Sequence, residues 1–117
     1  MDEDLMKQRT KEFAKQIIQL CRQMPNFREG RLIGDQLFRA GTSVAANYRS
    51  ACRARSKADF ISKLSIVEEE ADESLFWLEI IKEMKIFYAP FMDSLVKEND
   101  EIIAILVSSI KTSRKNR

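Results

Sequence analysis

Basic side chains are the residues of this sequence with the clearest capacity for chemistry. Arg49 and Arg53 lie one helical turn apart, and Arg55 and Lys57 flank a helix-capping signal. Arginine binds phosphate through a planar guanidinium group with two donating edges, so such a cluster can hold a phosphodiester backbone. Tyr48 is the only aromatic residue nearby, which argues against stacking on bases. We expect contacts with nucleic acid to be electrostatic and weakly sequence-specific, through these candidates: Arg39, Arg49, Arg53, Arg55, Lys57 and Lys63.

An acidic run, Glu68 to Glu73, is the second group with potential chemistry. Carboxylates in helical bundles can bridge metal ions, but those sites also take a Glu-x-x-His pair from each of two helices. The sequence has no histidine. We therefore predict no metal site and interpret the run as a charged helix face.

No arrangement typical of an enzyme stands out. Serine and cysteine are present, but histidine, the usual base that activates them, is absent. The sequence has no glycine-rich phosphate-binding loop. We therefore predict a protein that is not an enzyme and that needs no cofactor.

The basic and acidic residues occupy consecutive segments. Residues 31–63 contain seven basic and two acidic residues, whereas residues 64–86 contain seven acidic and two basic residues. Two interpretations remain open: neighbouring helices attract each other through complementary faces, or the basic segment is a binding surface. The net charge of +2 is too small to decide between them.

Composition is typical of a single helical domain. The 117 residues suit one domain, and 44% hydrophobic with 32% charged residues exclude disorder. Three glycines and two prolines leave few turns, which favours long helices. Cys21 and Cys52 are typical of buried thiols in a reducing compartment, with a disulfide as the open alternative. Because there is no signal segment and no membrane-spanning stretch, we expect a cytoplasmic protein without a membrane partner.

Apolar residues recur at intervals of three and four in four segments. Pro25 and Pro90 mark two of the breaks. The third helix should begin at a capping box formed by Ser56 and Asp59. The fold class that we expect is all-α, an antiparallel up-and-down four-helix bundle in one domain, 1–117. Its expected helices cover residues 4–24, 30–53, 57–87 and 90–112.

The second helix combines small residues with polar ones. Gly34 and Gly41 each cost about 1 kcal/mol of helix propensity relative to alanine, and a close helix contact would offset that cost. Asp35 and Arg39 have the spacing of an ion pair on one helix face. Asn47 falls on the predicted apolar seam, where an unpaired amide costs about 1–3 kcal/mol. We therefore predict a specific partner for Asn47, either as a core residue that fixes register or as a ligand contact.

The third and fourth helices carry more apolar surface than one bundle can bury. Between residues 75 and 84, apolar side chains cover most of the helix circumference, which is not typical of a surface helix. A second copy of the chain is the simplest partner for such a surface. We predict a homo-oligomer, with these candidate interface residues: Phe76, Trp77, Ile80, Ile103 and Val107.

A string of residues in the second and third helices resembles a known family pattern. The family is that of bacterial four-helix bundle proteins named after intervening sequences in large-subunit ribosomal RNA genes. The resemblance extends from about Phe13 to Ile110 and rests on Gly34-Asp35-Gln36-Leu37, Arg39-Ala40, Ser43-Val44-Ala45-Ala46-Asn47, Arg55-Ser56-Lys57 and Asp59-Phe60. It gives these motif residues a structural role: Gly34, Asp35, Gln36, Ser43, Asn47, Ser56 and Asp59.

The resemblance also implies an assembly and a partner. Proteins of this family form rings, typically homopentamers. They are similar to the accessory variability proteins of diversity-generating retroelements, which are basic pentamers that associate with nucleic acid and a reverse transcriptase. We therefore expect an accessory protein that associates with RNA, DNA or a nucleoprotein. The alternative is a protein-interaction scaffold, in which the basic face of the second helix only meets the acidic face of the third.

Overall fold

Four helices make up the computed structural model, which describes residues 2–116. They are α1 (Glu3–Gln23), α2 (Arg28–Ala51), α3 (Lys57–Glu83) and α4 (Phe91–Lys115). No strand occurs in this range, so the fold class is all-α, as predicted. None of the helices within it is long and apolar enough to cross a membrane.

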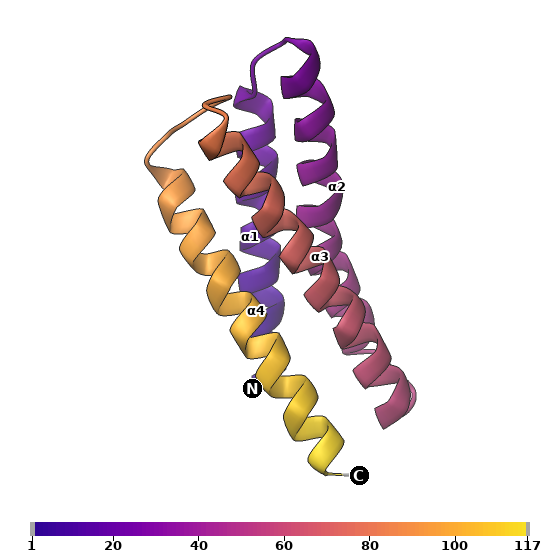
Figure 1. Ribbon diagram of the computed structural model, residues 1–117. Helices are drawn as coiled ribbons and strands as arrows, with labels where there is room; N and C mark the ends of the chain where they lie inside the picture. The colour runs from indigo at the N-terminus through magenta and orange to yellow at the C-terminus, as the bar shows by residue number, and fades with distance from the viewer. Residues whose placement is uncertain (1, 117) are drawn as a thin grey trace.

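Each helix packs against two others in an elongated molecule of 49 × 21 × 20 Å. α1 and α3 both contact α2 and α4. The α1–α2 and α3–α4 connections lie at one end of the molecule, and the α2–α3 connection lies at the other (Figure 1). We call this second end the terminal end; it holds the first turns of α1 and α3 and the last turns of α2 and α4.

Local signals set the starts of two helices. Asp2 caps α1 by accepting hydrogen bonds from the backbone amides of Asp4 and Leu5. Ser56 caps α3 by accepting a 3.1 Å hydrogen bond from the amide of Asp59, which confirms the predicted cap. The basic residues Arg53 and Arg55 lie in the connection between α2 and α3, where the chain changes direction sharply before Lys57 begins α3.

The ends of α3 and α4 differ from the prediction. α3 stops at Glu83 and not at residue 87, because Lys85 takes a left-handed φ of 54°. The amide of Lys85 donates to the carbonyl of Lys82, and that of Ile86 to Ile81, the Schellman arrangement that ends many helices. α4 continues to Lys115, so it extends beyond residue 112, the expected end of the fourth helix.

The core between the helices consists of apolar side chains from all four. Tyr48 occupies the position predicted for Asn47 and is fully buried. Both positions suit the spacing after Val44, but an aromatic ring removes far more apolar surface from water than an amide side chain does. The largest fully buried side chains are Tyr48, Phe13, Met6, Ile17, Leu20, Leu37, Leu64, Leu78, Ile81, Met92, Leu95 and Ile102.

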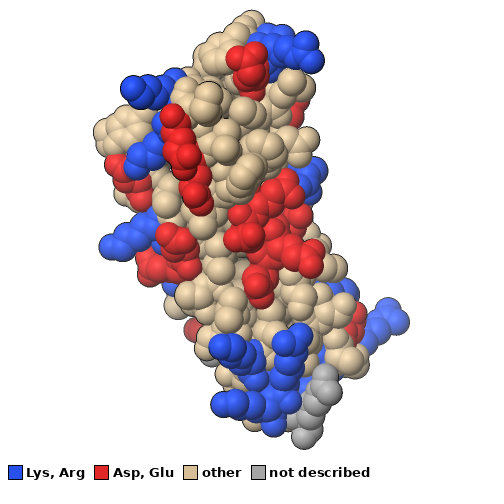
Figure 2. Space-filling model, viewed as in Figure 1, with Lys and Arg blue, Asp and Glu red and all other residues tan. Residues whose placement is uncertain are grey.

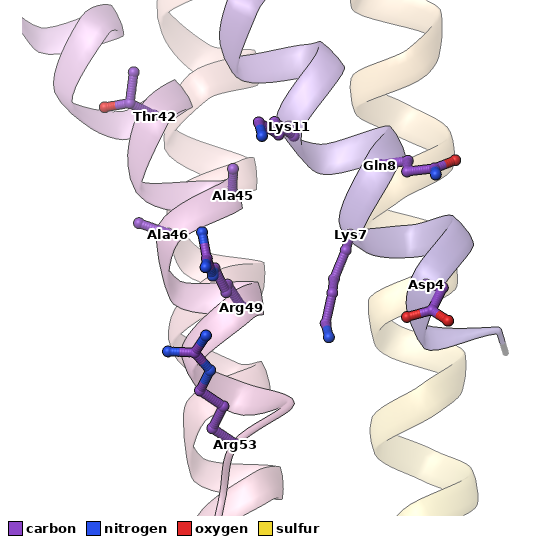
Figure 3. Close-up of a pocket in the computed structure, with 9 residues that line it drawn as sticks. All are labelled: Asp4, Lys7, Gln8, Lys11, Thr42, Ala45, Ala46, Arg49 and Arg53. Carbon is purple, nitrogen blue, oxygen red and sulfur yellow. The ribbon is translucent and has the colours of Figure 1, made fainter.

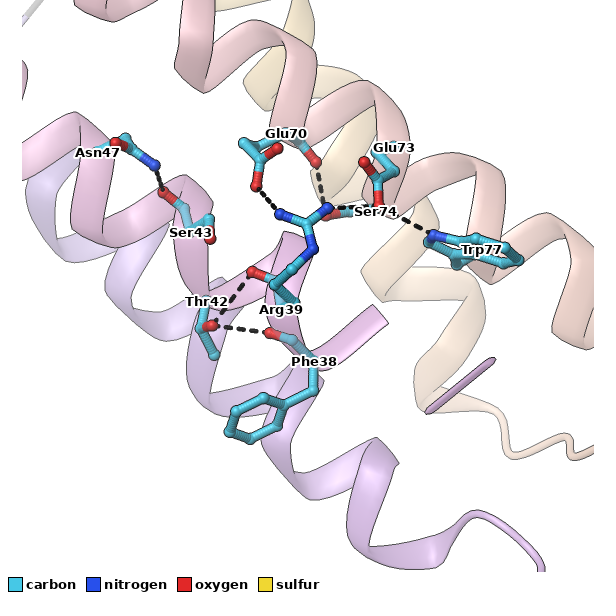
Figure 4. A network of polar contacts seen from close by, with 9 residues as sticks. All are labelled: Phe38, Arg39, Thr42, Ser43, Asn47, Glu70, Glu73, Ser74 and Trp77. Atoms are coloured by element: carbon cyan, nitrogen blue, oxygen red, sulfur yellow. Dashed lines mark hydrogen bonds and ion pairs between the residues drawn. The ribbon is translucent and has the colours of Figure 1, made fainter. Parts of the chain in front are cut away.

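The buried amide that links two helices is Asn99, not Asn47. The prediction that Asn47 fixes helix register was wrong: it is half-buried and donates a 2.9 Å hydrogen bond to the carbonyl of Ser43 in its own helix (Figure 4). Asn99 is fully buried, and its Nδ2 donates to the carbonyl of Ala71 at 2.8 Å. Because Oδ1 of Asn99 has no partner within residues 2–116, this contact fixes α4 on α3 at some cost in stability.

Cys21 and Cys52 are free and half-buried, so the alternative of a disulfide was wrong. Burial, aided by the nearby charge of Asp35, raises the pKa of the Cys21 thiol to about 11. The Cys21 Sγ lies 3.4 Å from the carbonyl oxygen of Gly34 in α2. Cys21 therefore packs at the α1–α2 contact as a small neutral group.

Of the two glycines predicted to allow a close helix contact, Gly41 lies at the closer one. A Cβ atom added there would lie 2.7 Å from Cγ1 and 2.8 Å from Cγ2 of the buried Ile17. At Gly34 the nearest atom, Cγ of Met24, would be 3.6 Å away, which is an ordinary contact. The prediction that a close helix contact requires small residues is therefore confirmed for Gly41 and wrong for Gly34.

Two alanine substitutions should distinguish the packing role of Gly41 from that of Gly34. We expect Gly41→Ala to lower the free energy of unfolding by about 1–2 kcal/mol, because β-branched Ile17 has no room to move. We expect Gly34→Ala to raise it by up to about 1 kcal/mol, through helix propensity alone. Urea unfolding of both variants measures the difference. Equal stabilities would show that Gly41 does not lie at the closer contact.

Candidate nucleic-acid interface

A groove between α1 and α2 gathers four basic side chains at the terminal end. α1 supplies Lys7 and Lys11, α2 supplies Arg49, and the connection after α2 supplies Arg53. The groove has a volume of about 720 Å³, and we call it the α1–α2 groove. The other residues that line it are Asp4, Gln8, Thr42, Ala45 and Ala46.

The four cations form two short rows, one on each helix. Lys7 and Lys11 project from α1 into the space between the helices, and Arg49 and Arg53 stand on the α2 side of it (Figure 3). All four are exposed, and none of the four side chains makes a hydrogen bond or ion pair with another described residue. Their charges are therefore available to an anion.

Small side chains keep the groove open. Ala45 and Ala46 line it from α2, and the hydroxyl of Thr42 is turned back to donate to the carbonyl of Phe38 at 2.7 Å (Figure 4). Asp4 is the single acid among the lining residues. Bringing four like charges together costs electrostatic energy that one acid offsets only in part.

Arg39, by contrast, is bound to the acidic face of α3. Its Nη1 lies 2.8 Å from Oε2 of Glu70, and its Nη2 lies 2.6 Å from Oε2 of Glu73 (Figure 4). The hydrogen bond from Arg39, joined by one from the Trp77 indole, holds the pKa of Glu73 below its ordinary value. The predicted pairing of Arg39 with Asp35 was wrong, since two carboxylates across the α2–α3 contact replace it.

The remaining basic candidates have separate environments around the start of α3. Arg55 is exposed in the α2–α3 connection. Lys57 donates to the backbone carbonyl of Asn116, beyond the end of α4, and Lys63 pairs with Asp59 at 3.3 Å. The structure therefore places Arg49 and Arg53 in one groove and leaves Arg39, Lys57 and Lys63 engaged elsewhere.

Sequence analysis missed five further basic residues at the terminal end. Lys7 and Lys11 belong to the α1–α2 groove. On the α3–α4 side, basic side chains gather where α4 ends, whereas acidic ones gather over the middle of the molecule (Figure 2). The exposed basic residues of that last part of α4 are Lys111, Arg114 and Lys115. The repeat of Lys7 and Lys11 at i, i+4 was the available signal, since an up-and-down order brings it beside the end of α2.

The motif residues lie in α2 and at the start of α3. Gly34 is buried against Met24, while Asp35 and Gln36 are exposed. The carbonyl of Ser43 accepts the hydrogen bond from Asn47. None of these residues lines the α1–α2 groove.

The candidate interface residues stay partly accessible in the single chain. Phe76 is 51% exposed, and its ring packs edge-on against that of Trp77, with centroids 4.9 Å apart. The indole Nε1 of Trp77 donates to Glu73 at 3.2 Å. Trp77 and the other three candidates are half-buried: Ile80, Ile103 and Val107.

Comparisons with known proteins identify relatives along nearly the whole chain. Residues 3–108 match a family described as 23S rRNA-intervening sequence protein. The fold is similar to the crystal structure of a protein of unknown function from the S23 ribosomal protein family of Bacteroides thetaiotaomicron VPI-5482. That similarity has 35% sequence identity and a TM-score of 0.86, and it covers 95% of this chain and 99% of the other. A comparison with curated proteins found no match.

The contact between Arg39 and Glu73 should make stability depend on pH. Because the folded pKa of Glu73 lies below its ordinary 4.5, the pair contributes its full stability above that pH and loses it as the pH falls through the folded pKa. We expect Arg39→Ala to lower the free energy of unfolding at pH 7 and to have a smaller effect at about pH 3. Urea unfolding at both pH values tests this. Asp35→Ala is the control and should leave the pH dependence unchanged; an equal effect of the two variants would contradict the assignment.

Proposed function

Because the chain belongs to the family of 23S rRNA-intervening sequence proteins, we propose that it is a non-enzymatic accessory protein that binds nucleic acid or a nucleoprotein through the α1–α2 groove. The observation that carries the proposal is the convergence of Lys7, Lys11, Arg49 and Arg53 on one open groove, with no side-chain partner for any of them among residues 2–116. Clustered unpaired cations are the usual electrostatic footprint of a phosphate-binding surface.

The relatives support the same class of partner. The family description refers to ribosomal RNA, and the similar structure is assigned to a ribosomal protein family. Arg55, exposed beside the end of α2, extends the proposed surface beyond the groove. Arg39 lies outside the proposed surface because Glu70 and Glu73 neutralise it.

A scaffold without a nucleic-acid role remains the second candidate. The specific observation in its favour is the Arg39 contact, where the basic face of α2 meets the acidic face of α3. Complementary charge does not account for Arg49 and Arg53, however, because they face α1 and its lysines. The scaffold therefore explains one of the basic candidates and leaves the groove unexplained.

We further propose that the protein acts as a homo-oligomer, with the five members that the resemblance implies. The half-exposed Phe76 and the half-buried Trp77 and Ile80 on α3 supply the apolar surface, together with Ile103 and Val107 on α4. The protomer would be the antiparallel up-and-down bundle predicted from the sequence, and the alternating positions of its connections support that order (Figure 1). A ring would display several copies of the groove and raise affinity for a long ligand.

Removing groove cations should weaken binding to any nucleic acid. We expect the triple variant Arg49→Ala, Arg53→Ala, Arg55→Ala to bind labelled RNA at least about tenfold more weakly and to reduce the dependence of log K on log salt by about 1 per lost phosphate contact. Fluorescence anisotropy between about 50 and 200 mM salt measures both quantities.

The matched control is Arg22→Ala, Arg28→Ala, Lys97→Ala, which removes three exposed cations away from the groove. Its binding should stay close to that of the parent protein. Absence of RNA and DNA binding by the parent at the lowest salt would support the scaffold instead.

A charge placed in the apolar surface should dissociate the oligomer. We expect the parent to have a mass several times 13.6 kDa by light scattering at micromolar concentration, and Phe76→Glu to have the monomer mass. The variant should keep its helical circular dichroism, because Phe76 is half exposed in the single chain. Phe38→Glu is the control, since Phe38 is similarly exposed but lies on α2; a monomeric parent would contradict the proposal.

A further inference from the structure

We infer that the α1–α2 groove holds one single strand by its phosphates alone, with the bases turned away from the protein. The inference rests on the proposed function and goes beyond it by naming the part of the ligand that is recognised. It predicts a site that accepts any base sequence and that also accepts a backbone without bases. Three features of the groove carry it: the spacing of its cations, the chemistry of its floor and the spacing of the two helices that form it.

The cations are spaced for successive phosphates of one strand. Within each row the two residues are four apart, so their attachment points are separated by about 6 Å along the helix. Neighbouring phosphates of an extended strand lie at a similar distance. Because Lys7 and Lys11 face Arg49 and Arg53 across the groove, each phosphate in it can be approached from both sides.

The floor of the groove lacks groups that recognise bases. Ala45 and Ala46 offer only methyl groups, and the hydroxyl of Thr42 is already bonded to the carbonyl of Phe38. No aromatic residue lines the groove, and the nearby Tyr48 is fully buried in the core. Aromatic stacking is therefore missing, and the floor offers no free donor for base-edge hydrogen bonds.

The two remaining polar residues that line the groove, Gln8 and Asp4, do not provide recognition of bases either. Gln8 points away from α2 in the direction of α4 (Figure 3). Asp4 is the one acid that lines the groove, and a carboxylate repels a phosphate backbone. Asp4 therefore weakens binding of the proposed ligand and provides a variant that should improve it.

The spacing of the two helices that form the groove favours a single strand. Packed helices have axes about 8–10 Å apart, so the two rows of cations lie close enough to contact the same backbone from both sides. The two backbones of a duplex are held further apart, across grooves of which the major one is about 12 Å wide, so a duplex can place only one of them between the rows. At the end of α2, the exposed Arg55 continues the path of Arg49 and Arg53, so a strand that leaves the groove still meets a cation.

Competition experiments with altered ligands test the inference. A labelled single-stranded oligouridylate is bound to the full-length protein at low salt, and unlabelled competitors of equal length are added. We expect an oligoadenylate and an abasic deoxyribose-phosphate oligomer to compete within about twofold to threefold of the oligouridylate. A peptide nucleic acid with the same bases but an uncharged backbone should not compete, and a duplex should compete at least about tenfold more weakly.

Variants on the opposite side of the groove complete the test. We expect Lys7→Ala with Lys11→Ala to weaken binding about as much as Arg49→Ala with Arg53→Ala does, because both rows contact the same phosphates. Asp4→Asn should strengthen binding by about twofold to fivefold, whereas Asp72→Asn, an exposed acid on α3, should leave it unchanged.

The possible failures are distinguishable. If RNA binds but the abasic oligomer fails to compete, or if the homopolymers differ more than tenfold, the inference is wrong and the proposed function stands. If the duplex binds more tightly than the single strand, the inference is likewise wrong and the proposed function stands. If Arg49 and Arg53 matter but Lys7 and Lys11 do not, the ligand lies on α2 alone and the groove is not its site. If no nucleic acid binds at all, the inference and the proposed function both fail.

Discussion

The close contact between α1 and α2 at Gly41 is the constraint on which the candidate site depends. Ile17 fills the space that a side chain at position 41 would occupy, and both residues are fully or nearly buried. This packing brings the two helices close together at Gly41. Toward the terminal end, where Ala45 and Ala46 succeed Gly41, small side chains leave an open groove between the two rows of cations.

The groove concentrates charge that the fold itself does not need. Two cations elsewhere in the described chain meet acids on another helix: Arg39 binds Glu70 and Glu73, and Arg9 binds Glu98 at 2.6 Å. In the groove, Lys7 and Lys11 instead face Arg49 and Arg53, with Asp4 alone to offset them. Apolar packing beneath must stabilise this arrangement against repulsion. This arrangement is the one that the proposed binding of an anionic ligand would use.

The architecture followed from the sequence because local signals and long periodic patterns agreed. Ser56 and Asp59 marked the start of α3, and spacings of three and four gave four helices. The predictions that were wrong concern features that depend on the conformation or the choice of one residue. Lys85 takes a left-handed conformation and ends α3 early, and Tyr48 takes the core position expected for Asn47. Periodicity averages over many residues and cannot resolve a choice between two adjacent ones.

By itself, the sequence determined the helices, the fold class, the cap of α3 and the membership of Arg49 and Arg53 in a basic cluster. These depend on chemistry within a few residues along the chain. Only the tertiary structure decided which charges meet: that Arg39 is neutralised by α3, that Lys7 and Lys11 complete a groove with α2, and that Lys57 reaches the end of α4. Such pairings depend on how each helix is rotated about its axis. That rotation is set by packing between residues far apart in sequence, such as Gly41 on Ile17 and Asn99 on Ala71.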